Sequence, residues 1–208
     1  MVNNTINYIT ATCSIRNNRV YKDGRLLFES ADEKVPDFLA AVYTFLSPGY
    51  PKFYKMDNLS KLGWLGTEIL LSGFDKSGYK PEDVGIVLAN SNSSLDTDRR
   101  YFETVSEYPS PSLFVYTLPN IVIGEICIRH GFRGENAFFV FEQFEIPFIA
   151  NYVKNLFNSE ETKACICGWV EILGDEYEAM LYLVEPKQGN DIFDAEGMRT
   201  AYNAEKTN

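Results

Sequence analysis

Residues 84–89 form a short, almost unbroken run of apolar residues, Val-Gly-Ile-Val-Leu-Ala. A run of this length, with β-branched side chains and with turn residues on its flanks, is typical of a strand that is covered on both faces. Such strands occur in sheets that carry helices on their faces. This run therefore favours an α/β protein.

The other periodic segments of the chain fit the same architecture. We expect further strands over residues 6–14, 19–28 (with an Asp23-Gly24 turn), 136–141, 164–173 and 177–185. We expect helices over 35–46 with Pro36 in the first turn, from an Asn58 or Ser60 cap to Gly73, from Pro119 to Gly131, and over 144–157. The order predicts one domain over residues 1–186, a mixed central sheet flanked by helices in αβα layers. Residues 187–208 are polar, and we expect a partly ordered tail there.

The formal net charge of −10 limits the partners that this chain can have. It argues against nucleic acid, because phosphate contacts need clustered Lys and Arg, and against an acidic protein unless a local basic patch exists. No apolar run reaches membrane-spanning length, and residues 1–10 lack the basic and apolar regions of a signal peptide. We therefore expect a soluble, cytoplasmic protein that binds neither nucleic acid nor a membrane.

The four cysteines, Cys13, Cys127, Cys165 and Cys167, lie in apolar stretches rather than in turn-rich loops. This placement does not indicate the disulfide framework of a secreted protein. The chain has one histidine, so a zinc site with the usual ligands is not favoured either. We interpret the thiols as core side chains and expect neither a metal nor a cofactor.

Gln143 lies at the junction between the predicted strand 136–141 and the predicted helix 144–157. Enzymes of the α/β class commonly hold a nucleophile at such a junction, because the tight turn pushes one side chain out of the sheet. The side chain here is an amide, which is neither a nucleophile nor a base. Two interpretations stay open: the amide hydrogen-bonds a ligand carbonyl, or it ties the strand end to backbone in a closed pocket.

A polar loop, Asn90 to Ser94, follows the C-terminal end of the run 84–89. Ligands of open α/β sheets are often bound at this place. We therefore predict that Asn90 and Ser91, together with Gln143 and Phe144, bind a substrate. The alternative is an ordinary strand-to-helix loop.

Four short motifs follow one another in the chain: Thr117-Leu118-Pro119-Asn120, Gly124-Glu125-Ile126, Gly131-Phe132-Arg133-Gly134 and Cys167-Gly168-Trp169-Val170-Glu171. Together they resemble the N-terminal half of β-ketoacyl-[acyl-carrier-protein] synthases of the thiolase fold. In that family the catalytic cysteine lies nine residues after the last glycine of the Gly-x-Arg-Gly turn, a count that leads here from Gly134 to Gln143. The resemblance covers roughly residues 5–185 and implies a thiolase-like half.

Two departures from the family change what the resemblance implies. Gln143 replaces the cysteine, and the C-terminal half with its two catalytic histidines is missing, since His130 lies at no catalytic position. The family includes chain-length factors, which carry glutamine here and pair with an active ketosynthase. The resemblance thus implies a non-catalytic ketosynthase-like subunit that forms a homodimer or a heterodimer with a β-ketoacyl synthase in fatty-acid or polyketide assembly. Acyl-carrier protein is a further candidate partner.

Two other functions stay open. The chain is an acyl- or pantetheine-binding module, or it is an acyltransferase that uses an unrecognised nucleophile among Cys127, Cys165 and Cys167. The predicted helix 144–157 is apolar on nearly all sides and carries Phe144, Phe148, Tyr152 and Phe157. A helix of this kind must be covered on nearly all sides. We expect that another chain covers it, or that local aromatic packing does.

Overall fold

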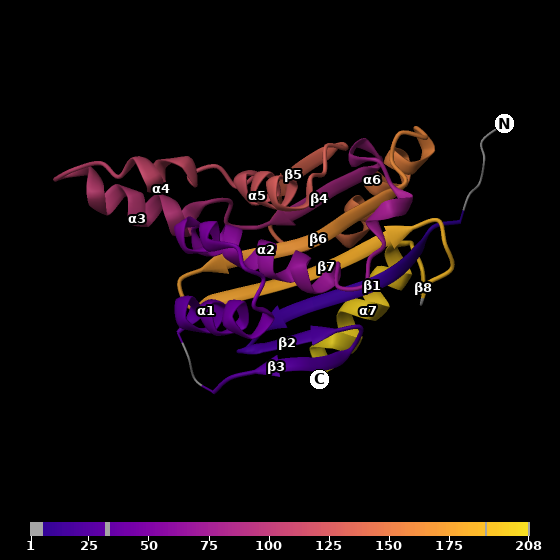
Figure 1. Cartoon of the computed structure of the whole chain (residues 1–208), viewed down its shortest axis with the longest axis horizontal. Coiled ribbons are helices and arrows are strands. Elements are labelled where there is room, and N and C mark those ends of the chain that lie inside the picture. The colour runs from indigo at the N-terminus through magenta and orange to yellow at the C-terminus, as the bar shows by residue number, and fades with distance from the viewer. Residues whose placement is uncertain (1–5, 32–33, 190, 208) are drawn as a thin grey trace.

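The structure, a computed structural model, describes residues 6–31, 34–189 and 191–207. One mixed sheet crosses the molecule, with helices on both of its faces (Figure 1). The strands lie in the order β3-β2-β1-β7-β6-β4-β5, and β8 pairs with β1. Their bounds are β1 Tyr8–Arg16, β2 Arg19–Lys22, β3 Arg25–Glu29, β4 Val84–Asn90, β5 Asn136–Val140, β6 Ala164–Leu173, β7 Glu176–Glu185 and β8 Asp191–Ile192. The expected mixed sheet with flanking helices is confirmed.

Seven α-helices surround the sheet in the described residues: α1 Val35–Leu46, α2 Asn58–Leu70, α3 Leu95–Val105, α4 Pro111–Val115, α5 Ile121–His130, α6 Ile146–Asn158 and α7 Ala195–Thr207. Three short 3-10 helices span Pro51–Lys55, Lys76–Gly78 and Pro81–Asp83. Among these elements, none is long and apolar enough to span a membrane.

Strand β4 is the strand that the sequence marks most clearly, and all seven of its residues are buried. Its side chains alternate between the two layers, because successive residues of a strand point to opposite faces. Ile86 and Leu88 join the core beneath α1, α2 and α5, whereas Val87 and Ala89 join the core beneath α6 and α7. The expectation of a strand covered on both faces is confirmed.

Local signals set the helix ends closely. Helix α1 has Pro36 in its first turn and ends at Ser47, whose φ of 46° is left-handed. Helix α5 ends at Gly131, which adopts φ 76° as glycine readily does. Both expected caps of α2, Asn58 and Ser60, are wrong: Asp57 is the N-cap, and its carboxylate accepts the backbone N–H of Ser60 at 2.9 Å. A carboxylate at this position satisfies an N–H that the helix leaves free.

Two other expectations differ from the structure. Residues 19–28 form a hairpin of two strands, β2 and β3, rather than one strand, because Asp23 and Gly24 both take positive φ values and reverse the chain. The expected partly ordered tail after Pro186 is also wrong for the described residues, since β8 and α7 are formed there. Phe193 and Met198 are 2% and 0% exposed in the core beside α6, and this burial holds the segment in place.

Candidate functional site

The C-terminal ends of three neighbouring parallel strands meet at one place. β4 lies between β5 and β6 and runs parallel to both. The chain leaves β4 through α3, α4 and α5 to reach β5, and then passes through α6 to β6 on the other side of β4. In open α/β sheets, ligands commonly bind at the strand ends beside a reversal of this kind. Asn90 ends β4, Gln143 follows β5, and Glu171 lies near the end of β6.

The loop after β4 is organised by the carboxylate of Glu171. Its Oε2 accepts the backbone N–H groups of Ser91 and Asn92, at 2.5 and 3.1 Å, and the Ser91 hydroxyl at 2.8 Å. Its Oε1 accepts the amide Nδ2 of Asn92 at 3.1 Å. Successive backbone N–H groups of this kind form a concave site that suits an anion. Here the anion is a side chain of the same protein.

Asn90 is fully buried and shapes the loop from the other side. Its Oδ1 accepts the backbone N–H of Ser93 at 3.0 Å, and its Nδ2 donates to the Ser93 carbonyl at 2.8 Å. Ser93 takes a left-handed φ of 52°. Asn90 therefore closes a tight turn, and both ends of its amide are occupied.

Gln143 lies in the loop between β5 and α6, as the sequence indicates, and its side chain is exposed. The Gln143 amide Nε2 donates to Glu145 Oε1 at 3.1 Å. The amide therefore points to solvent and not into a closed pocket of this chain. The loop is tied to the neighbouring strand, because the N–H of Phe141 donates to the Asn90 carbonyl at 2.9 Å.

Phe144 faces inward beside this loop and is half-buried. Its ring stacks on Trp169 of β6 with 5.5 Å between centroids, and it meets Tyr202 of α7 edge-on at 5.5 Å. Both arrangements are favourable for aromatic pairs. The chain thus covers Phe144 with its own C-terminal helix.

Glu171, Asn92 and Tyr202 belong to this site, although none of the three was among the predicted site residues; Glu171 ends one of the four motifs and Asn92 lies in the predicted loop. A signal for Tyr202 was present in the spacing of Met198, Tyr202 and Glu205, which repeats at helical intervals. The motif that ends at Glu171 marks the residue, but nothing in the sequence indicates its contact with the loop after β4. Its contacts with Ser91 and Asn92 bridge about 80 residues of sequence.

None of the four thiols is an exposed, activated nucleophile. Cys13, Cys165 and Cys167 are completely buried, and burial raises the pKa of each thiol. Burial also raises the pKa of Cys127, which is half-buried on α5. A raised pKa keeps a thiol protonated, and the protonated form is a poor nucleophile.

Solved structures with a similar arrangement include ketosynthases in complex with their partners. The ishigamide ketosynthase/chain length factor matches with a TM-score of 0.62 and 17% identity over 86% of this chain. A type II PKS acyl-carrier protein in complex with its ketosynthase matches with a TM-score of 0.60 and 15% identity over 87% of this chain. A ketosynthase in complex with its chain length factor from Xenorhabdus doucetiae matches with a TM-score of 0.55 and 10% identity over 90% of this chain. The chain has a ketosynthase-like, thiolase-type fold.

The chain spans 62% of the length of the first two matched chains and 80% of the third. No protein-family model matches the sequence, and no curated protein matches it either. At these identities the likeness establishes the fold, and the fold alone.

The only histidine of the sequence lies away from the strand ends, at the last residue of α5. His130 Nε2 contacts Glu68 at 2.9 Å, while its Nδ1 faces the Lys76 ammonium at 2.9 Å. The ring also stacks on Phe132. Within the described residues, no three His, Cys, Asp or Glu side chains lie close enough to hold a metal ion.

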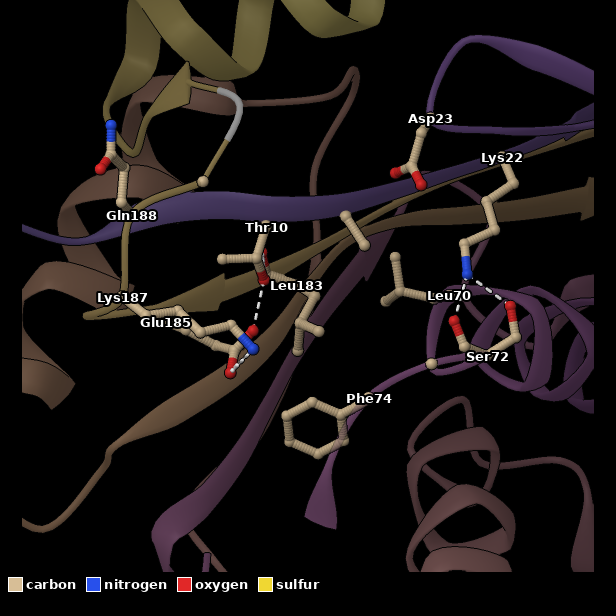
Figure 2. A pocket seen from close by; sticks show the side chains of 13 residues that line it. Thr10, Lys22, Asp23, Leu70, Ser72, Phe74, Leu183, Glu185, Lys187 and Gln188 are labelled. Carbon is tan, nitrogen blue, oxygen red and sulfur yellow. Dashed lines mark hydrogen bonds and ion pairs between the residues drawn. The ribbon is translucent and has the colours of Figure 1, made fainter. Parts of the chain in front are cut away.

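A cleft of about 460 Å³ lies elsewhere, between β1, β7 and the end of α2 (Figure 2). Its charged groups already have partners: Glu185 accepts the Thr10 hydroxyl at 2.5 Å and pairs with Lys187 at 2.9 Å, and Lys22 donates to Ser72. Figure 2 shows these pairs across the cleft. The polar groups of the cleft thus join β1 to β7 and join β2 to the segment that follows α2.

Proposed function

We propose that this protein is a non-catalytic, ketosynthase-like subunit that pairs with another ketosynthase-like chain in polyketide or fatty-acid assembly. The observation that carries the proposal is the β5–α6 junction, where an exposed amide and an open sheet edge occur side by side. The matched structures include a ketosynthase in complex with its chain length factor.

The chemistry of the junction supports a non-catalytic role. An amide cannot attack an acyl thioester, and Gln143 donates its hydrogen bond to Glu145 within the same loop. The thiols that an alternative acyltransferase would need are buried or half-buried with raised pKa values. The alternative of an acyltransferase with an unrecognised cysteine nucleophile therefore lacks an exposed, activated thiol.

The open edge supports pairing with another chain. None of the residues of β5 is buried, in contrast to the fully buried β4 beside it. Val140 is 51% exposed, and Phe148 of α6 is 42% exposed although it packs on Phe139 and Phe141. A partner that covered these side chains would gain about 25 cal/mol for each Å² of apolar surface removed from water.

The apolar surface that a partner would cover is smaller than the sequence suggested. Helix α6 is not apolar on nearly all sides, as its sequence suggested, because Asn151, Lys154 and Asn155 form an exposed polar face. Phe144 is covered by Trp169 and Tyr202 of the same chain. The expectation of local aromatic packing is thus met for Phe144, and the surface left for a partner is β5 with the adjoining part of α6.

A second candidate function is an acyl- or pantetheine-binding module. The exposed amide of Gln143 at the strand ends supports it, because an amide can hydrogen-bond a carbonyl group. Binding of acyl-carrier protein to wild type and to Gln143→Ala, measured by calorimetry, tests this candidate. Equal affinity of the two proteins would remove Gln143 from the binding site.

The proposed function is tested by co-expression with a ketosynthase from the same organism, followed by size-exclusion chromatography with light scattering. We expect a one-to-one complex that Val140→Lys breaks, because the substitution places a charge on the open edge. Asn151→Lys adds the same charge to the polar face of α6 and should leave the complex intact. Absence of a complex, or a complex that Val140→Lys leaves unchanged, would contradict the proposal.

A further inference from the structure

Strand β5 has only one neighbour in the described sheet. The N–H of Ile86 donates to the Glu135 carbonyl and the N–H of Phe141 donates to the Asn90 carbonyl, each at 2.9 Å. Backbone groups alternate in direction along a strand. Those of Asn136, Phe138 and Val140 therefore point away from β4, toward the open side of the sheet. Such an edge can accept a further strand from another chain.

The N-terminal end of this edge is acidic. A cleft of about 640 Å³ lies beside the start of β5, between the turn after Gly131, the segment before β4 and the end of α6. Its exposed charged residues are two cations, Lys80 and Arg133, and four carboxylates, Glu82, Glu135, Glu160 and Glu161. Asp83 also lines the cleft, but it is paired with Lys163 at 2.9 Å. The cleft therefore has an excess of negative charge.

The C-terminal end of the same edge is acidic as well. Glu142 is exposed directly after β5, and Glu145 follows in the loop to α6. Between the two ends the strand is apolar from Ala137 to Phe141. The edge thus has an apolar centre with carboxylates at both ends.

These charges disfavour a second copy of this chain as the occupant. Antiparallel pairing of two β5 strands places the Glu135 end of one copy against the Glu142 end of the other, and like charges placed across a strand pair are destabilising. Two chains of net charge −10 also repel each other at long range. The other edge of the sheet differs, because β3 has Arg25 at one end and Glu29 at the other.

We infer that the occupant of the β5 edge is an extended strand of a different protein, with an apolar centre and basic residues at both ends. The inference rests on the proposed function and specifies its partner: a heterologous chain with a basic edge strand, not a copy of this protein. Charge complementarity of this kind raises the rate of association and excludes wrong partners.

The test uses two fluorescent peptides with the same apolar centre, one with lysines at both ends and one with glutamates. Their binding to the full chain is measured by fluorescence anisotropy at low and at high salt. We expect the basic peptide to bind at least about tenfold more tightly at low salt, with the preference reduced at high salt. Glu135→Gln combined with Glu142→Gln should reduce the preference, and Val140→Lys should abolish binding. Asn151→Lys is the control that leaves binding unchanged.

Equal binding of the two peptides, binding of neither, or a stable homodimer that Val140→Lys dissociates would each overturn the inference. The result is separable from the test of the proposed function. If a co-expressed ketosynthase forms a complex but the basic peptide is not preferred, the proposed function stands and the inference of a partner strand with basic ends is wrong. If the basic peptide is preferred but no ketosynthase complex forms, the edge has another basic partner and the proposed function falls.

Discussion

The Ser91 hydroxyl donates a hydrogen bond to Glu171 Oε2 at 2.8 Å, and this contact joins the loop after β4 to the end of β6. The same carboxylate accepts the backbone N–H groups of Ser91 and Asn92. A loop that the sequence predicts as a ligand site therefore already encloses an anionic group of the protein. The role of Asn90 and Ser91 in substrate binding stays a prediction, and the geometry assigns them first to holding the loop.

Replacing Glu171 with Gln should loosen this loop. An amide offers one acceptor oxygen in place of two and turns an N–H₂ group toward N–H donors, so the loss is about 1–3 kcal/mol in free energy of unfolding. Urea denaturation measures the loss, and faster hydrogen exchange at the amides of Ser91 and Asn92 locates it. Glu176→Gln, at an exposed position on β7, is the matched control. Equal stability of the two variants would show that the Glu171 contacts contribute nothing.

Phe193→Ala should show that the C-terminal segment belongs to the folded core. Phe193 is 2% exposed, and removing a buried phenyl ring costs about 3–5 kcal/mol. Its neighbour Ile192 is 55% exposed, so Ile192→Ala should cost far less. Thermal and urea unfolding of both variants check the difference. A disordered tail would make both substitutions neutral.

Glu205 of α7 should make stability depend on pH. Burial raises the pKa of its carboxyl, and the bond from the Gly24 N–H offsets part of that rise. The folded state therefore binds more protons than the unfolded state between the two pKa values, and the contribution of Glu205 to stability falls as pH rises through that window. Glu205→Gln should be more favourable relative to wild type at about pH 7 than at about pH 4.

Urea denaturation at both pH values measures this difference. Glu196 is exposed on the same helix, so Glu196→Gln, measured at the same two pH values, serves as the surface control. A difference between wild type and Glu205→Gln that is the same at both pH values would contradict the assignment.

The thiols should resist alkylation in the native protein. Cys13, Cys165 and Cys167 are fully buried, so iodoacetamide should label them only after denaturation, while the half-buried Cys127 reacts slowly. Mass spectrometry with and without denaturant counts the labelled sites. Rapid native labelling of one cysteine in stoichiometric amount would revive the acyltransferase interpretation.

Gly168→Ala should destabilise the β6–β7 pair. Gly168 has a φ of 149°, and an added methyl group would meet the carbonyl oxygen of Met180 on β7. We expect a loss of at least about 1–3 kcal/mol from the backbone conformation alone. Gly124→Ala on α5 is the control, because open space surrounds that position and alanine favours a helix. Urea denaturation should then rank Gly124→Ala as the more stable variant.

Much of the fold could be predicted because its signals are local. The buried run of β4, the Pro36 start of α1 and the Gly131 end of α5 are encoded by neighbouring residues. The strand-to-helix junction at Gln143 could be placed for the same reason. Helix α7 could not be predicted from its composition, because most of its residues are polar. Met198 and Tyr202 nevertheless lie at helical spacing on its inner face.

The sequence by itself determined the elements, the covered sheet and the amide at the β5–α6 junction, since each depends on residues within one or two turns of chain. Only the tertiary structure decided that Glu171 fills the loop of Ser91, that Tyr202 covers Phe144, and that β5 is an open edge with acidic ends. The physical reason is that these features depend on which distant segments the strand order brings together. Periodicity within a segment carries no information about that order.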